Sequence, residues 1–232
     1  MTGMLASVNC VSEALLVLEA GVDIIDLKQP ALGALGALDV IAVQEIVTEV
    51  NRRCPVSATI GDIPMQPQLV FNAVKAMAET GVDYVKIGFF PGDDGLGTLN
   101  QLSLLTAQGY RLIAVLFADT QPDYSVLTAL KEAGFTGVML DTLDKKSGSL
   151  TQLMSPVALI EFVKQAKALA LLCGLAGSLR LDDIPSLLPY QADYLGFRGA
   201  LCQGKIRVGQ LNPAAVLQIK EAIKQSALKQ SQ

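Results

Sequence analysis

Apolar and polar residues alternate in four short segments of this chain, and the four segments follow one pattern. The third and fifth positions are apolar in every copy, whereas the fourth and sixth positions hold two lysines, two aspartates and an arginine. The copies are DIIDLK (23–28), DYVKIG (83–88), TGVMLD (136–141) and DYLGFR (193–198). Successive side chains of a β-strand point to opposite faces. The pattern therefore predicts four strands, each with one apolar face and one face that can carry charge.

Four further apolar segments alternate with these copies, at 5–8, 56–60, 112–117 and 169–175, and each of the eight strand-like segments precedes a helix-like one. Ser and Asp favour helix N-caps, Pro favours the first turn, and Gly favours the end. These signals predict helices from Ser12 to Gly21, from Asp39 through Arg53, from Pro67 to just before Gly81, from Pro122-Asp123 to Gly134, from Pro156 through Ala168, and from Asn212-Pro213 onward.

Strands that alternate with helices predict a parallel sheet with right-handed crossovers. Eight such units in 232 residues predict a single-domain (β/α)₈ TIM barrel that spans 1–232. A doubly wound sheet is the alternative, but that architecture does not require charged residues at matching positions on alternate strands.

Alternate strands of such a barrel supply the side chains of each interior layer. The four copies are the even-numbered strands, so we expect Asp26 and Lys86 in one layer. We expect Lys28, Asp141 and Arg198 in the next layer, at the C-terminal mouth where barrel enzymes have their active sites. Burial of an unpaired charge is costly, so these charges favour a functional site over solvated strand ends.

Glycine-rich loops follow several of the predicted strands. Those after strands two and six occupy 29–38 and 141–149, and the second of them holds Lys145 four residues beyond Asp141. The loops after strands seven and eight, at 173–180 and 196–204, are the usual phosphate-binding loops of barrel enzymes. The expected phosphate ligands are backbone amides together with a bidentate arginine: Gly174, Gly177, Ser178, Arg198 and Gly199.

Composition excludes several kinds of site. The chain has no histidine, so it contains neither a Ser-His-Asp triad nor a His-ligated metal, and proton transfer must use carboxylates or a lysine of lowered pKa. The four cysteines have no CxxC spacing and are expected to be reduced thiols rather than disulfides or zinc ligands. The net charge of −4 without a basic cluster argues against nucleic acid as a partner. Short apolar runs and the lack of a leader argue against a membrane and predict a cytoplasmic protein.

Two lysines in one lumen suggest imine chemistry on a phosphorylated carbonyl compound. An amine attacks a carbonyl only when it is neutral, and both desolvation and a second cation lower its pKa. Lys28 and Lys86 can lower the pKa of one another. The alternative is that the two lysines are structural ion-pair partners of Asp26 and Asp141.

Three segments, DLKQPALGALGA (26–37), VDYVKIGF (82–89) and LDTLDKKSGSL (140–150), resemble the (5-formylfuran-3-yl)methyl phosphate synthase family. The resemblance extends over essentially the whole chain. It implies a barrel enzyme, a lyase that condenses two molecules of glyceraldehyde 3-phosphate into a furan aldehyde phosphate, with loss of phosphate and water. The product would be the furan precursor of methanofuran or of a methylotroph analogue.

The resemblance also implies roles for individual residues. Lys28 corresponds to the imine-forming lysine and Lys86 to the proton-accepting lysine, while Asp26, Asp141 and Lys145 correspond to the other functional charges. The D-T-x-x-K spacing favours Lys145 over its neighbour, Lys146, as the lysine that faces the site. No cofactor is expected, the expected partner is a triose phosphate, and the expected assembly is a homo-oligomer.

Two other functions remain open at this point. A generic class I aldolase or isomerase acting on a phosphosugar would use the same imine lysine without making a furan. A non-catalytic protein that binds phosphorylated metabolites would leave the two inward lysines without a purpose.

Overall fold

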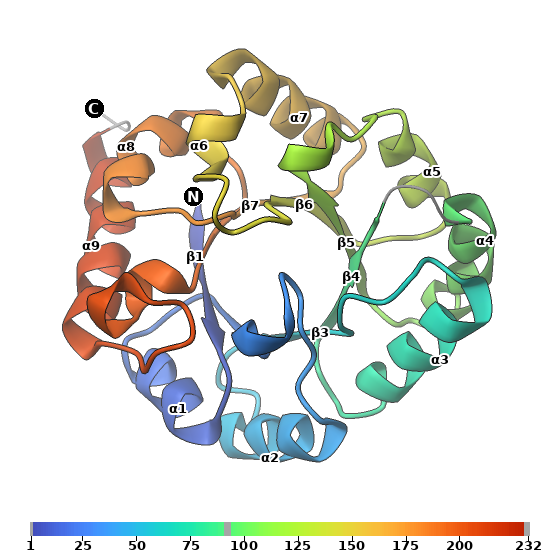
Figure 1. Ribbon diagram of the computed structural model, residues 1–232, viewed down its shortest axis with the longest axis horizontal. Coiled ribbons are helices and arrows are strands. Elements are labelled where there is room, and N and C mark those ends of the chain that lie inside the picture. Colours follow the sequence, from blue (N-terminus) through green and yellow to red (C-terminus); the bar gives the residue numbers. More distant parts are fainter. Residues whose placement is uncertain (1, 91–93, 230–232) are drawn as a thin grey trace.

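The chain folds into a closed barrel of eight parallel strands surrounded by helices (Figure 1). The computed structural model describes residues 2–90 and 94–229. The strands pair in sequence order, and the barrel closes where β8 pairs with β1. They are β1 (Gly3–Val8), β2 (Ile24–Leu27), β3 (Val56–Thr59), β4 (Tyr84–Gly88), β5 (Leu112–Phe117), β6 (Gly137–Asp141), β7 (Leu172–Leu175) and β8 (Tyr194–Phe197). The predicted TIM-barrel fold is confirmed, whereas the bounds of 1–232 stay a prediction.

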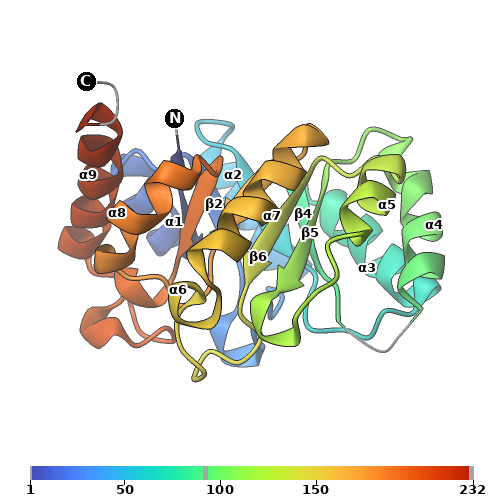
Figure 2. The same cartoon turned by 90° about the horizontal axis from the view of Figure 1, so that it is seen from above.

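Helices cover the outside of the barrel, and the loops after the strands gather on the lower edge of Figure 2. The α-helices are α1 (Val11–Glu19), α2 (Val40–Val50), α3 (Pro67–Ala78), α4 (Gly95–Thr106), α5 (Val126–Glu132), α6 (Leu150–Leu153), α7 (Pro156–Ala168), α8 (Ile184–Leu187) and α9 (Pro213–Lys229). Short 3₁₀ helices lie in the loops: η1 (Pro30–Leu32), η2 (Ala118–Thr120), η3 (Leu181–Asp183), η4 (Leu188–Tyr190), η5 (Gly199–Leu201) and η6 (Gln203–Lys205). Within the described ranges, no helix is long and apolar enough to cross a membrane.

The two faces of the sheet differ as the alternating pattern predicts. Ile25 and Val85 belong to the large apolar core that the strands share with the surrounding helices. Asp26 and Lys86, the next residues along the same strands, are buried on the opposite face and contact each other inside the barrel. The predicted parity of the even-numbered strands is therefore correct.

The aspartates at the first position of three copies have a structural role that the pattern alone did not reveal. Asp23, Asp83 and Asp193 each accept a hydrogen bond from the backbone amide of a residue in the preceding strand, at 2.7–2.8 Å. Such carboxylates satisfy amides at the N-terminal end of the barrel, where each strand begins. The carboxylate at the first position therefore pairs with backbone amides of the sheet, whereas the charged side chains at the fourth and sixth positions face the lumen.

Several predicted boundaries need correction. The first helix begins after Cys10 instead of Ser12, and α5 begins at Val126 because Asp123 forms a local turn with Ser125. The helix predicted through residue 53 ends at 50, where a left-handed residue follows. The seventh strand begins at 172 instead of 169, because the end of α7 and a residue of positive φ occupy 169–171. The predicted starts at Asp39, Pro67, Pro156 and Pro213 are correct.

Candidate active site

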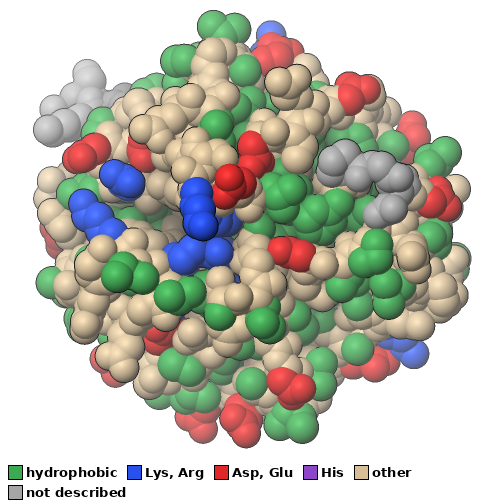
Figure 3. Space-filling view, in the orientation of Figure 1, with side chains coloured by type: hydrophobic (Ala, Val, Ile, Leu, Met, Phe, Trp, Pro, Cys, Tyr) green, Lys and Arg blue, Asp and Glu red, His purple; other side chains and the backbone are tan. Residues whose placement is uncertain are grey.

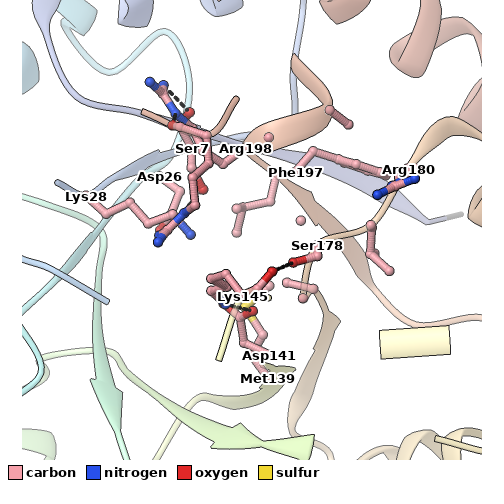
Figure 4. Close-up of a pocket in the computed structure, with 18 of the residues that line it drawn as sticks. Ser7, Asp26, Lys28, Met139, Asp141, Lys145, Ser178, Arg180, Phe197 and Arg198 are labelled. Carbon is pink, nitrogen blue, oxygen red and sulfur yellow. Dashed lines mark hydrogen bonds and ion pairs between the residues drawn. The ribbon is translucent and has the colours of Figure 1, made fainter. Parts of the chain in front are cut away.

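A cavity of about 250 Å³ opens at the C-terminal mouth of the barrel. Residues from five strands (β1, β2, β4, β6 and β8) and from the loops after β2, β6, β7 and β8 line it, and the ionisable side chains face one another across it (Figure 4). Below them, apolar side chains that include Leu5, Ile24 and Met139 fill the lumen. The charged groups therefore lie above an apolar floor, where electrostatic interactions are stronger than in water.

Asp26 and Lys86 form a fully enclosed ion pair at the bottom of the cavity. The Lys86 Nζ lies 2.8 Å from Asp26 Oδ1, and both side chains are almost completely buried. Ser57 donates to the same carboxylate at 2.7 Å and Ser7 donates at 2.8 Å. Burial alone would raise the pKa of Asp26, but the charges of Lys86 and Lys28 and these hydrogen bonds outweigh it and lower the pKa. Asp26 is thus a fixed anion that holds Lys86 in place.

Lys28 lies in the same cavity, and its amine differs from that of Lys86 in its contacts. Its side chain is buried, and within the described part of the chain its ammonium group has no hydrogen bond or ion pair. Desolvation lowers the pKa of Lys28 to about 8, against the attraction of Asp141 and Asp26, while Lys86 adds to the lowering. An amine with this pKa is neutral in about one molecule in ten at pH 7, compared with far fewer for an exposed lysine. Lys28 therefore has the properties of an amine nucleophile.

Asp141 and Lys145 form a second pair across the cavity from Lys28 (Figure 4). The Lys145 Nζ lies 2.5 Å from Asp141 Oδ1 and also donates to the carbonyl oxygen of Thr142. Burial raises the pKa of Asp141, but the charges of Lys145 and Lys28 lower it by more, so the carboxylate stays ionised. As the spacing predicted, Lys145 lines the cavity, whereas Lys146 is exposed to solvent.

These contacts lead to a paired prediction for the two adjacent lysines. Lys145→Ala leaves the buried Asp141 carboxylate without its cation, so we expect kcat/KM to fall about 10²-fold or more, the usual worth of a positioned acid–base group. Lys146→Ala removes an exposed cation and is the matched control, with an expected change of less than about twofold. Steady-state assays on both variants test this, and equal losses would contradict the assignment of Lys145 to the site.

Carboxylates from neighbouring loops fix the two loops that flank Lys28 and Lys145. Asp62, after β3, accepts hydrogen bonds at 2.8 Å from the amides of Ala34 and Leu35 in the loop after β2. Gly33 in that loop has a φ of +128°, and a Cβ there would lie 2.0 Å from Asp62 Oδ2, so only glycine fits. Asp119, after β5, similarly binds two amides of the loop after β6, at 2.7–2.8 Å. Lys28 and Lys145 therefore lie on loops with little freedom.

The loops after β7 and β8 line the cavity with residues whose backbone amides are unpaired among the residues described. Three such residues follow β7 and two follow β8, and none of their amides has a hydrogen-bond partner among the residues described: Gly177, Ser178, Leu179, Gly199 and Ala200. We call these amides the amide cradle. Gly177 has a φ of +108°, and a Cβ there would lie 2.7 Å from Thr142, so glycine is required at this position too. Free amides at these two loops suit a phosphate group.

Two of the predicted phosphate ligands need correction. The Arg198 side chain uses its five N–H groups on protein acceptors: the Glu13 carboxylate and the carbonyl oxygens of Ser7, Arg207 and Gly209. It lines the cavity as expected, but no donor is left for a bidentate contact with phosphate. Gly174 lies within β7 and packs on Met139 below the cavity, so its backbone is part of the sheet.

Three cations at the mouth were missed by the sequence reasoning: Arg180, Lys205 and Arg207. Each lies in a loop after β7 or β8, a few residues beyond the strand, and the space-filling view shows lysine and arginine side chains gathered near the centre of this face (Figure 3). The sequence signal that could have identified these cations was their position in the two loops expected to bind phosphate. Glu13, the partner of Arg198, gave no signal because it comes from the first helix.

Comparison with known sequences gives consistent relatives. A family profile described as 4-HFC-P synthase matches residues 4–220. A Methylorubrum extorquens protein, provisionally named (5-formylfuran-3-yl)methyl phosphate synthase, is 41% identical over 222 residues, which are 95% of this chain and 91% of that protein. The (5-formylfuran-3-yl)methyl phosphate synthase of Methanopyrus kandleri is 35% identical over 223 residues, which are 91% of this chain and 94% of that protein.

Solved structures share the fold at low identity. Phosphoribosyl anthranilate isomerase from Thermotoga maritima has a TM-score of 0.70 and 12% identity, with 97% of this chain and all of that chain covered. A 3-keto-L-gulonate-6-phosphate decarboxylase from Vibrio cholerae has a TM-score of 0.69 and 12% identity, with 98% of each chain covered. At such identities the likeness shows the barrel architecture alone.

Proposed function

The chain belongs to the 4-HFC-P synthase family, and we propose that it is the enzyme that makes (5-formylfuran-3-yl)methyl phosphate from glyceraldehyde 3-phosphate. The observation that carries this proposal is the buried, unpaired Lys28 amine between two lysine–aspartate pairs. Family membership supports the product, and the arrangement of charged groups supports an imine route to it.

Imine formation is the first step that the site is suited to perform. The neutral Lys28 amine adds to the aldehyde carbon of one triose phosphate, and loss of water with uptake of one proton from solvent gives a protonated imine. This imine withdraws electrons from the adjacent carbon and makes its proton acidic. The Lys86–Asp26 pair, at hydrogen-bond distance from each other and in the same cavity, is the proposed group for moving that proton.

The remaining steps join the two substrates. The second triose phosphate loses its phosphate by elimination, and the nucleophilic carbon formed on the imine adds to its C3, so that its aldehyde carbon becomes the formyl group. The Asp141–Lys145 pair is the proposed group that protonates the oxygens that form or leave. One phosphate and two waters are lost, which balances two molecules of triose phosphate against one furan aldehyde phosphate. The amide cradle is the proposed site for the phosphate that the product keeps.

Incubation with glyceraldehyde 3-phosphate alone tests the function. We expect one inorganic phosphate for each furan aldehyde formed, with the product identified by ultraviolet absorption and mass. The Lys28→Arg variant gives the background from spontaneous phosphate loss. Substrate consumption without enzymatic phosphate release would instead identify a class I aldolase or isomerase, and binding without consumption would identify a metabolite-binding protein.

The lowered pKa of Lys28 predicts a pH dependence. The reactive form is the neutral amine, so kcat/KM should rise about tenfold per pH unit below pH 8 and level off above it, because the Lys28 pKa is about 8. Initial rates of phosphate release between about pH 7 and 9.5 measure this. A profile that is flat or falling from pH 7 to 8 would contradict the role of Lys28.

A further inference from the structure

Positive charge at the mouth exceeds what its carboxylates neutralise. Among the residues that the structure describes, two aspartates line the cavity, whereas seven cationic side chains do so: Lys28, Lys86, Lys145, Arg180, Arg198, Lys205 and Arg207. Three of these cations pair with Asp26, Asp141 and Glu13. The other four have no ion-pair partner in residues 2–90 and 94–229, although the whole chain has a net charge of −4. Lys28 reacts as a neutral amine, so Arg180, Lys205 and Arg207 are left for phosphate monoesters, each of which carries close to two negative charges.

Arg207 begins beside Gly199 of the amide cradle, where a Cβ on Gly199 would lie 3.7 Å from the Arg207 Cβ, but its guanidinium reaches another loop. It projects from the loop after β8 towards the loop after β2, where its Nη2 donates to the carbonyl oxygen of Gly33 at 2.9 Å. This is the one hydrogen bond that its side chain makes within the described ranges, so most of its donors are free. Burial lowers the pKa of the Arg207 guanidinium while Asp141 and Asp62 raise it, and an arginine remains charged under such conditions. A half-buried guanidinium with free donors is suited to a dianion.

The loop that carries Arg207 is held in place by the Arg198–Glu13 pair. Arg198 donates to the carbonyl oxygens of Arg207 and Gly209 at 2.8 and 2.9 Å. Glu13 accepts a hydrogen bond from the amide of Leu211 at 3.3 Å. Because these contacts fix the backbone at Arg207 and just after it, little conformational entropy is lost when its guanidinium binds an anion.

We propose that Arg207 binds the phosphate group of a second triose phosphate, while the amide cradle holds the phosphate of the first. The two places use different groups, since the cradle consists of backbone amides in the loops after β7 and β8, whereas the Arg207 guanidinium contacts the loop after β2. This assignment rests on the proposed function for the identity of the ligand, although the presence of two phosphate sites does not depend on turnover.

Equilibrium dialysis with labelled inorganic phosphate tests the two sites without catalysis. The unaltered chain should bind two phosphates, and Arg207→Gln should weaken one of them by about 10-fold or more and leave the other unchanged. Arg52→Gln is the matched control, because Arg52 is an exposed arginine far from the mouth, beyond the end of α2, and two phosphates of unchanged affinity are expected. One phosphate on the unaltered chain, or two unchanged phosphates on Arg207→Gln, would overturn the proposal.

Kinetics of the variants separate this proposal from the function itself. Arg207→Gln should still form a reducible adduct with triose phosphate on Lys28, but condensation should require about 10- to 100-fold more substrate. Arg207→Lys keeps the positive charge but lacks the planar set of N–H donors, so its substrate requirement should lie between those of the unaltered chain and of Arg207→Gln. This second variant also guards against a misfolded Arg207→Gln. An unchanged KM in both variants would overturn the second site and leave the proposed function intact.

Discussion

Lys28→Arg is expected to abolish furan formation, with a fall in kcat of about 10⁴-fold or more, because arginine keeps the positive charge but cannot form an imine. The change leaves the Lys86–Asp26 and Lys145–Asp141 pairs intact, so phosphate binding should persist. Rates of phosphate release, corrected for spontaneous elimination, measure the loss. Residual activity within about 10-fold of the unaltered chain would contradict a covalent role for Lys28.

Lys28→Met extends the same prediction to stability. A buried lysine with a pKa of about 8 destabilises the folded chain by roughly 3 kcal/mol below pH 8, because the unfolded chain binds the proton more tightly. Stability therefore rises as the pH increases from about 8 towards 10.5. Methionine removes this penalty, so the melting temperature at pH 7 should be equal or higher while activity is lost. A large decrease in melting temperature would show that Lys28 has a structural role.

Lys86→Arg is expected to separate imine formation from proton transfer. The arginine retains a cation beside Asp26, so the adduct on Lys28 should still form, whereas turnover should fall about 10²–10⁴-fold because the proton-transfer group is lost. The adduct should then accumulate in the variant during turnover. Measurement of both the adduct fraction and the rate distinguishes this outcome from simple disruption of the site. Normal turnover, or failure to form the adduct in a folded variant, would contradict the role given to Lys86.

The parity of the barrel strands was predictable because a period of two relates residues only a few positions apart. Asp26 and Lys86 both occupy the fourth position of their copies, and that alone placed them on the inner face. Lys28 and Asp141 are the sixth residues of their copies, and this placed them at the mouth of the barrel in the same way. Local backbone geometry carried this information, so no knowledge of tertiary contacts was needed.

Side-chain partners were not predictable in the same way. Arg198 has the correct parity, yet its guanidinium binds Glu13, which is 185 residues away in sequence. Such a partner depends on how α1 packs beside β8, and no periodicity encodes it. Gly174 was assigned from the composition of its loop, but the strand extends through it. Arg207 lies nine residues beyond Arg198, past two 3₁₀ turns, so its return to the mouth depends on the path of an irregular loop.

The central claim is that Lys28 forms an imine with triose phosphate, and chemical trapping tests it most directly. The chain is incubated with glyceraldehyde 3-phosphate and borohydride, and the modified peptide is identified by mass spectrometry. We predict that the reduced adduct lies on Lys28, with none on the exposed Lys146. An adduct on Lys86 or Lys145 instead, or no adduct under conditions in which the furan is formed, would contradict the account.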